Sequence, residues 1–182
     1  YIWDMYSIYY KNSSLLSKVG LKLFRPFLQR WDIKSSQNID SIVANSQFVS
    51  ARIKEFWNKD SIVLNPGIDF DKFHLSNNKK QQYIIVSQLV SYKNVELAIK
   101  AFNINKKKLF IIGDGPLFKK YSKMSNDNII LLGNTTNEVR NKYFSESKAL
   151  IFPGIEDFGL VPLEAMASGT PVIAYNKSGV KE

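Results

Sequence analysis

Two glutamates near the end of the sequence, Glu156 and Glu164, are separated by seven residues. A carboxylate accepts hydrogen bonds and repels phosphate, so this pair suits the hydroxyl groups of a hexose or a ribose. The residues between them begin a predicted helix, and the first amides of a helix favour anions such as phosphate. These amides belong to Phe158, Gly159, Leu160 and Val161. The pattern therefore predicts a site for a ligand with both phosphate and vicinal hydroxyls, as in a sugar nucleotide.

The elements that must position these groups form a strand–helix–strand unit. The apolar run at 149–152 stops at Pro153-Gly154, which predicts a buried strand followed by a turn. Pro162 suits the first helical turn, and Gly169 suits the position just after the helix. A second apolar run at 172–175 predicts the next strand. The alternative, a buried unit with solvated glutamates, leaves the combination of Glu156, Phe158 and Gly159 unexplained.

The stretch from Glu156 to Ala174, EDFGLVPLEAMASGTPVIA, resembles the E-x7-E signature of family 4 glycosyltransferases. Members of that family are retaining enzymes of the GT-B architecture. The resemblance implies an α/β fold of GT-B type, with a Rossmann-like parallel sheet flanked by helices, in a fragment of a two-domain enzyme. It also implies that Glu156 binds sugar hydroxyls and that Glu164 binds the ribose diol of the donor.

A second segment, Ser-Gln-Leu-Val-Ser-Tyr-Lys-Asn at 87–94, resembles the family's G-R-L-x-x-x-K motif, in which an Arg and a Lys hold the donor diphosphate. Lys93 matches the Lys, which implies a charge-assisted contact with the diphosphate. Gln88 replaces the Arg and can still donate a hydrogen bond, although it carries no charge. The alternative for Lys93 is a solvated lysine at a helix start.

Three further glycine-containing loops follow predicted strands. Gly-Asp-Gly-Pro at 113–116 lacks the third glycine of a dinucleotide fingerprint, which argues against NAD or FAD binding. Gly133-Asn134 resembles the family's loop near the nucleotide base. Ser178-Gly179 resembles a second glycine-rich donor loop, in which the family usually has Gly-Gly.

Strands and helices alternate from residue 83 onward. Short apolar runs predict strands at 83–89, 109–112 and 129–132, and amphipathic runs predict helices at 94–102, 117–124 and 137–146. Continuous apolar strands are typical of a parallel sheet covered on both faces. Such sheets bind ligands beyond the carboxyl ends of their strands, at the point where the strand order reverses.

The earlier residues resemble the last part of the family's acceptor domain. Strands are predicted at 41–44 and 61–64, around a helix at 47–57 that Ser46 caps. We therefore expect residues 1–69 to be the end of an N-terminal acceptor domain and 70–82 to be a linker. Residues 83–182 would be a donor domain that is incomplete at its carboxyl end. The first residue, Tyr, and the stop at Glu182 fit a fragment of a longer protein.

The first 31 residues are aromatic and basic. Residues 1–10 are expected to pack on a neighbouring domain or to line a sugar acceptor site, and the opening Tyr-Ile-Trp-Asp resembles a segment of mannosyltransferases of O-antigen synthesis. Residues 14–31 have helical periodicity, with Pro26 expected to kink or interrupt the helix. Between Lys11 and Arg30 there are five basic residues and no acidic one. Such a helix either lies on an anionic membrane surface or packs on its own domain.

Composition narrows the remaining possibilities. The 182 residues carry a net charge of +9, which favours anionic partners. The sequence has no cysteine and one histidine, His74, so disulfides and thiolate metal sites are excluded and a hydrolytic triad or histidine metal cluster is disfavoured. No apolar run reaches the length of a membrane span. We expect a cytoplasmic protein, with contact to the inner face of a membrane left open.

The resemblance implies transfer of a hexose with retention, mannose from GDP-mannose in the first instance, onto a glycan or lipid-linked glycan of a surface polysaccharide. Glu156 and Lys93 would be the catalytic residues, and no cofactor, metal or nucleic acid would take part. Two alternatives stay open. One is another GT-B activity, such as a sugar phosphorylase or a sucrose or trehalose synthase. The other is a non-enzymatic basic module that binds membranes or nucleic acid.

Overall fold

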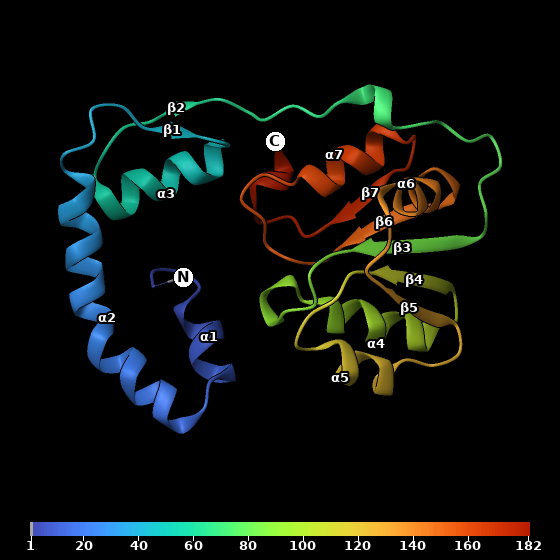
Figure 1. The fold of residues 1–182 in the computed structure, drawn as a ribbon, viewed down its shortest axis with the longest axis horizontal. Helices are drawn as coiled ribbons and strands as arrows, with labels where there is room; N and C mark the ends of the chain where they lie inside the picture. The colour runs from blue at the N-terminus through green and yellow to red at the C-terminus, as the bar shows by residue number, and fades with distance from the viewer. Residues whose placement is uncertain (1) are drawn as a thin grey trace. The chain divides into compact units, whose positions relative to one another are not determined.

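The computed structural model describes residues 2–182, so the part of the mannosyltransferase resemblance that falls on Tyr1 lies outside the described residues. The chain forms two compact units (Figure 1). One holds the residues up to Asn65 together with Glu182, and the other holds residues 66–181. The assignment of these regions to acceptor domain, linker and donor domain stays a prediction.

The first unit contains three helices and a small parallel sheet. Its helices are α1 (Tyr6–Asn12), α2 (Leu15–Ser36) and α3 (Gln47–Trp57), and strand β1 (Val43–Ala44) pairs with β2 (Ile62–Val63). As predicted, Ser46 caps α3, because its hydroxyl accepts a hydrogen bond of 3.0 Å from the Val49 amide.

Pro26 is expected to kink or interrupt its helix, and the interruption is wrong, because α2 continues through Pro26. Proline removes one backbone donor, but Pro26 lies on the exposed surface, where water can satisfy the carbonyl left over. Ser14 caps the helix by accepting a hydrogen bond from the Ser17 amide, and the helix runs on to Ser36, beyond the predicted end. No helix among residues 2–182 has the length and apolar character needed to span a membrane.

The polar side of α2 faces the rest of its unit. Arg25 Nε donates to the Ile2 carbonyl at 3.0 Å, and Asp32 accepts hydrogen bonds of 2.8 Å from the indoles of Trp3 and Trp57. The apolar side faces solvent, where Leu16 is 85% exposed and Phe27 is 67% exposed. This arrangement reverses the usual amphipathic pattern, in which the apolar stripe faces the core.

The second unit is a five-stranded parallel sheet with the order β5-β4-β3-β6-β7. The strands are β3 (Gln82–Val86), β4 (Lys108–Ile112), β5 (Ile129–Gly133), β6 (Ala149–Phe152) and β7 (Val172–Ala174). The helices are α4 (Val95–Asn105), α5 (Phe118–Met124), α6 (Asn137–Glu146) and α7 (Leu160–Ala167), with short 3₁₀ helices at Phe70–Lys72, Ser91–Lys93 and Gly179–Lys181. The predicted parallel sheet is therefore confirmed, and the helix predicted at 137–146 has the expected bounds.

Two hydrophobic cores cover the two faces of this sheet. Successive residues of a strand point to opposite faces, so Ile85 packs with α4 and α5 whereas Ile84 packs with α6 and α7. Figure 1 shows these helix pairs on opposite sides of the sheet. The central strands β3, β4 and β6 are thus largely buried on both faces, which explains why they are continuously apolar.

The strand order reverses between β3 and β6. From β3 the chain moves to β4 and β5 on one side, and β6 and β7 are added on the other side. Tyr83 pairs with Ala149 and Ile84 with Leu150 across this junction. In parallel sheets such a reversal leaves a crevice at the carboxyl ends of the two strands.

Candidate functional site

Lys93 and Glu156 meet across this crevice. Lys93 follows β3 and Glu156 follows β6, and Lys93 Nζ donates a hydrogen bond to Glu156 Oε2 in an ion pair. The lysine side chain is 14% exposed and the glutamate side chain 30% exposed. The two loops lie in close contact, since a Cβ added at Gly154 would lie 2.8 Å from the Lys93 Cα. The structure therefore brings together both residues predicted to be catalytic.

The start of α7 lies directly after Glu156. Gly159 adopts a left-handed conformation with φ of +106°, and no side chain caps the helix. The Leu163 amide donates a hydrogen bond of 3.4 Å to the Gly159 carbonyl. The amides of residues 158–161 lie before Leu163 in the chain, at the start of the helix, where backbone amides have no carbonyl of the preceding turn to bond. An uncapped helix start of this kind can accept an anion.

The loop around Gly179 supports this helix start. The Gly179 amide donates to the Glu156 carbonyl at 3.0 Å, and a Cβ at Gly179 would lie 2.0 Å from the Asp157 carbonyl oxygen. The structure thus places the predicted Ser178-Gly179 loop against the glutamate loop. The side chain of Ser178 is buried, and its hydroxyl has no hydrogen-bond partner among residues 2–182.

Glu164 lies in the second turn of α7 and faces α6. Its Oε1 lies 3.4 Å from Arg140 Nη2, and its Oε2 is buried without a hydrogen-bond partner within the described part of the chain. Burial raises the pKa of the Glu164 carboxyl, and the positive charge of Arg140 opposes this rise. Glu164 and Glu156 therefore have different cationic partners.

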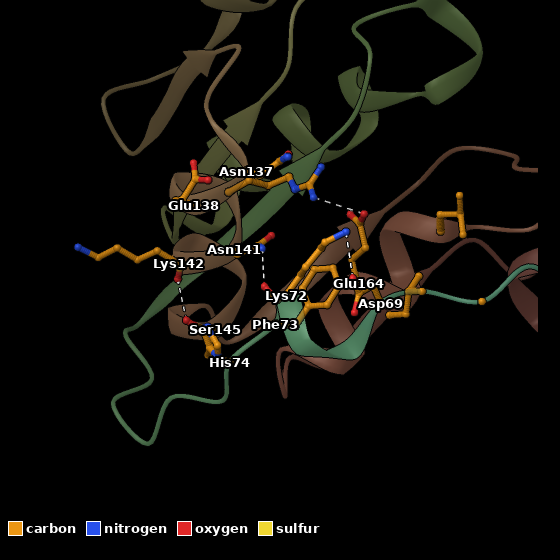
Figure 2. Close-up of a pocket in the computed structure, with 14 residues that line it drawn as sticks. Asp69, Lys72, Phe73, His74, Asn137, Glu138, Asn141, Lys142, Ser145 and Glu164 are labelled. Atoms are coloured by element: carbon orange, nitrogen blue, oxygen red, sulfur yellow. Dashed lines mark hydrogen bonds and ion pairs between the residues drawn. The ribbon is translucent and has the colours of Figure 1, made fainter.

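A cavity of about 850 Å³ lies beside Glu164 (Figure 2). Its walls come from residues 67–74, from α6 and from the start of α7, where Leu160 and Glu164 line it. Arg140 pairs with Glu164 at one side of the cavity. Lys72 pairs with Asp69 at 3.0 Å, and Figure 2 shows these two residues near Glu164. The volume is in the range of small-molecule sites and is large enough for a nucleoside.

The other predicted site residues lie outside this cavity wall. Gln88 is exposed in the loop after β3. Gly133 ends β5 with φ of +67°, and its carbonyl accepts a 2.8 Å hydrogen bond from the Gly113 amide. Asn134 follows it and is exposed. The loop with Gly133 and Asn134 does lead directly into α6, whose first residues line the cavity.

Sequence reasoning missed Arg140. It is 24 residues before Glu164 in the chain, and nothing in the local pattern of α6 distinguishes it from other basic residues. Only the packing of α6 against α7 brings the two side chains together. Among residues 2–182, no cluster of three or more His, Asp or Glu side chains is placed to hold a metal ion.

Comparison with known proteins adds an independent line of support. Residues 68–182 match the family described as glycosyl transferases group 1. An uncharacterized glycosyltransferase of Methanocaldococcus jannaschii is 30% identical over 157 residues, which are 81% of this chain and 43% of that protein. The alpha-1,3/1,6-mannosyltransferase ALG2 of Saccharomyces cerevisiae is 23% identical, over 98% of this chain and 47% of that protein.

Solved structures share the fold. The crystal structure of Anabaena Alr3699/HepE in complex with UDP and glucose superposes with a TM-score of 0.74 at 19% identity, covering 84% of this chain and 49% of that one. The predicted α/β fold of GT-B type is therefore confirmed. The chain spans less than half the length of the two relatives named above.

Proposed function

Because this chain belongs to the glycosyl transferases group 1 family, we propose that its protein transfers a hexose from a nucleotide sugar to a glycan. The observation that carries the proposal is the meeting of Lys93 and Glu156 across the strand-order reversal, next to the uncapped start of α7. A cation, an anion-accepting helix end and a carboxylate at one place match the phosphate and hydroxyl groups of such a donor.

Each part of the donor has a proposed place. The diphosphate contacts Lys93 and the amides of residues 158–161, with Gln88 as an uncharged donor nearby. Glu156 accepts hydrogen bonds from the transferred sugar. The nucleoside occupies the cavity beside α6, where Glu164 accepts hydrogen bonds from the ribose, and the loop with Gly133 and Asn134 lies near the base.

The proposed reaction proceeds with retention. The bond between the sugar C1 and the diphosphate oxygen breaks, and an acceptor hydroxyl bonds to C1 on the same face through an oxocarbenium-like state. The hydroxyl proton passes to the departing diphosphate. Lys93 and the helix amides stabilise the charge that develops on this leaving group, which is the electrostatic contribution that dominates in many enzymes. The scheme uses no metal or cofactor.

GDP-mannose is the first candidate donor, because the similarity to the mannosyltransferase ALG2 extends over nearly all of this chain. UDP-glucose is the second, because the similar HepE structure was solved with UDP and glucose. The proposed acceptor is a glycan or lipid-linked glycan of a surface polysaccharide. The protein would work in the cytoplasm.

Contact with an anionic membrane is a separate part of the proposal. The solvent-facing side of α2 carries Leu16, Leu23 and Phe27, each exposed by more than 60%, and basic side chains of the same helix accompany them. Exposed apolar groups flanked by cations match the interface of an anionic bilayer. A lipid-linked acceptor would be reached from that surface.

The test uses the full-length protein and a thermal-shift screen with GDP-mannose, UDP-glucose, UDP-GlcNAc and their free nucleotides, followed by transfer assays. Glu156→Ala and Glu164→Ala should abolish or strongly reduce transfer, whereas Glu55→Ala, at an exposed position of α3, should leave it intact. Unchanged transfer in both site variants would refute the proposal.

The same assays separate the alternatives. A phosphorylase would respond to free phosphate and a sugar phosphate in place of a nucleotide sugar, and a sucrose or trehalose synthase would use a free sugar as acceptor. A non-enzymatic basic module would show strongly salt-dependent binding without nucleotide preference.

A further inference from the structure

Arg140 of α6 contacts the carboxylate of Glu164 on the neighbouring helix α7. Its guanidinium reaches Glu164 Oε1 at 3.4 Å, and the two side chains are 24% and 18% exposed. The guanidinium carbon also lies 6.0 Å from the ring centroid of Phe144, one turn further along α6 and fully buried. Arg140 thus contacts a ring of its own helix and, at the same time, the carboxylate of Glu164 on α7.

The environment of Glu164 disfavours its charged form unless a cation lies nearby. One of its oxygens is buried without a hydrogen-bond partner in the described chain, and burial disfavours the charged form of a carboxyl group. A protonated carboxyl would offer only one free acceptor oxygen and would lose the charge that strengthens its bonds to hydroxyl groups. A cation at close range counteracts both effects.

The other charged and titratable groups around the cavity are not placed to do this. On the 67–74 segment, Lys72 is paired with Asp69 at 3.0 Å, and His74 lies further along the same wall. On α6, Glu138 and Lys142 line the cavity. Among the described residues, Arg140 is the cation that contacts the Glu164 carboxylate.

We propose that Arg140 is a positioning residue that holds the Glu164 carboxylate in place and keeps it charged for the ribose hydroxyls of the donor. The inference rests on the proposed function of Glu164 and adds a residue that acts through it. Arg140 Nε is itself buried without a partner in the described chain, so a bound nucleotide or a water molecule would complete its hydrogen bonding.

The test measures the affinity of the full-length protein for GDP and UDP by calorimetry, between about pH 6 and about pH 8.5. The variants are Arg140→Met, which keeps the length of the side chain without its charge, and Arg140→Lys, which keeps the charge. Lys142→Met is the matched control, because it removes a cation from the same helix and the same cavity wall. Each affinity is compared with that of the wild-type protein at the same pH.

Arg140→Met should weaken nucleotide binding by roughly tenfold at neutral pH, and the loss should grow as the pH falls, because the unpaired Glu164 takes up a proton. Arg140→Lys and Lys142→Met should keep the wild-type pH profile. Glu164→Gln should weaken binding at all pH values, and adding Arg140→Met to it should cause little further loss.

The outcomes distinguish a failure of this inference from a failure of the proposed function. A wild-type pH profile in Arg140→Met, together with weak binding in Glu164→Gln, would overturn the role of Arg140 and leave the donor site standing. Full affinity in Glu164→Gln, or a wild-type protein that binds neither GDP nor UDP, would overturn the proposed function and the inference with it. A lower melting temperature without a changed pH profile would indicate a merely structural role and would also overturn the inference.

Discussion

At the scale of single residues, Lys93 and Glu156 form an ion pair and neutralise each other. A donor diphosphate has to share the lysine with this carboxylate, since both are anions. The glutamate therefore has two effects on the proposed reaction: it weakens the binding of a bare nucleoside diphosphate and strengthens the binding of the sugar. These two effects can be measured separately.

Glu156→Gln should tighten the binding of GDP or UDP by a few fold, because a partly exposed ion pair contributes about 1 kcal/mol at most. The same change should lower transfer, since the sugar loses its charged acceptor. Calorimetry with free nucleotides and a transfer assay with nucleotide sugars measure the two quantities. Glu55→Gln removes the same charge at an exposed position of α3 and should change neither. Weaker nucleotide binding in Glu156→Gln would contradict the argument.

Gln88→Arg should tighten donor binding by about 1–2 kcal/mol, because it adds a charged donor at the position where the family has Arg. The gain should shrink as salt is added. Calorimetry with GDP at low and at moderate salt measures it, with Gln88→Leu as the control for loss of the amide. Equal affinity of the arginine variant and wild type would show that residue 88 does not reach the diphosphate.

The residues of the site could be predicted from the sequence only where they belong to short continuous motifs. Glu156 and Glu164 share one such motif, and Lys93 belongs to another. Arg140 belongs to neither, because its role depends on the packing of α6 against α7. Pairing between distant segments leaves no trace in local periodicity, which explains why this residue was missed.

At the scale of elements, helix ends were the most predictable feature. Ser46 and Pro162 are found where capping and first-turn preferences place them, and Gly169 has φ of +69° just after α7. The extent of α2 was not predictable, because the cost of Pro26 inside a helix depends on whether its surroundings are solvent or protein. The orientation of α2 was not predictable either, because periodicity identifies an apolar face of a helix but not what that face contacts.

Charge reversal on α2 should reduce binding to anionic vesicles if the helix lies on a membrane. Lys22→Glu with Arg30→Glu is the suitable variant, because both side chains are exposed, whereas Arg25 donates to the Ile2 carbonyl and has to be kept. Each basic residue near an anionic surface contributes about 1 kcal/mol, so the double reversal should reduce binding by at least roughly tenfold. Sedimentation with phosphatidylserine vesicles measures the bound fraction.

The matched control for that experiment is Lys119→Glu with Lys123→Glu, which makes the same change in net charge at exposed positions of α5. It should leave vesicle binding largely intact. Equal loss in both double variants would show that net charge alone attracts the protein. Unchanged binding in the α2 variant would indicate that α2 packs against protein.

Gly113, in the loop after β4, should tolerate an added methyl group poorly. Gly113 has φ of +129°, and a Cβ there would lie 2.0 Å from the Ser87 carbonyl oxygen, at the end of the neighbouring strand β3. Gly113→Ala should therefore lower the free energy of unfolding by about 2–4 kcal/mol. Urea denaturation of the full-length protein measures the change.

Gly20→Ala is its control, because a Cβ at Gly20 meets nothing within 4 Å and the residue lies inside α2. That substitution should stabilise the protein by about 0.5–1 kcal/mol, since alanine favours a helix over glycine. A Gly113→Ala protein as stable as wild type would show that the β3 and β4 loops separate easily.

At the scale of the whole molecule, charge and topology point to the same class of ligand. The net charge of +9 attracts anions, and the parallel sheet offers its crevice at the strand-order reversal. The sheet could be predicted because its strands are short, apolar and separated by helices. The placement of Lys93 opposite Glu156 required knowledge of strand order, which the sequence supplied only through its resemblance to a family.

The residues of the proposed donor site come from separate stretches of chain. Lys93 follows β3, whereas Arg140 and Glu164 lie within one continuous stretch from α6 to α7. The segment proposed to choose the nucleotide therefore also carries the helix amides proposed to hold the diphosphate, whereas Lys93 lies outside it. Replacing residues 134–164 with those of a relative that uses another donor should change the preferred base. Lys93 of this chain would still contact the diphosphate of the new donor.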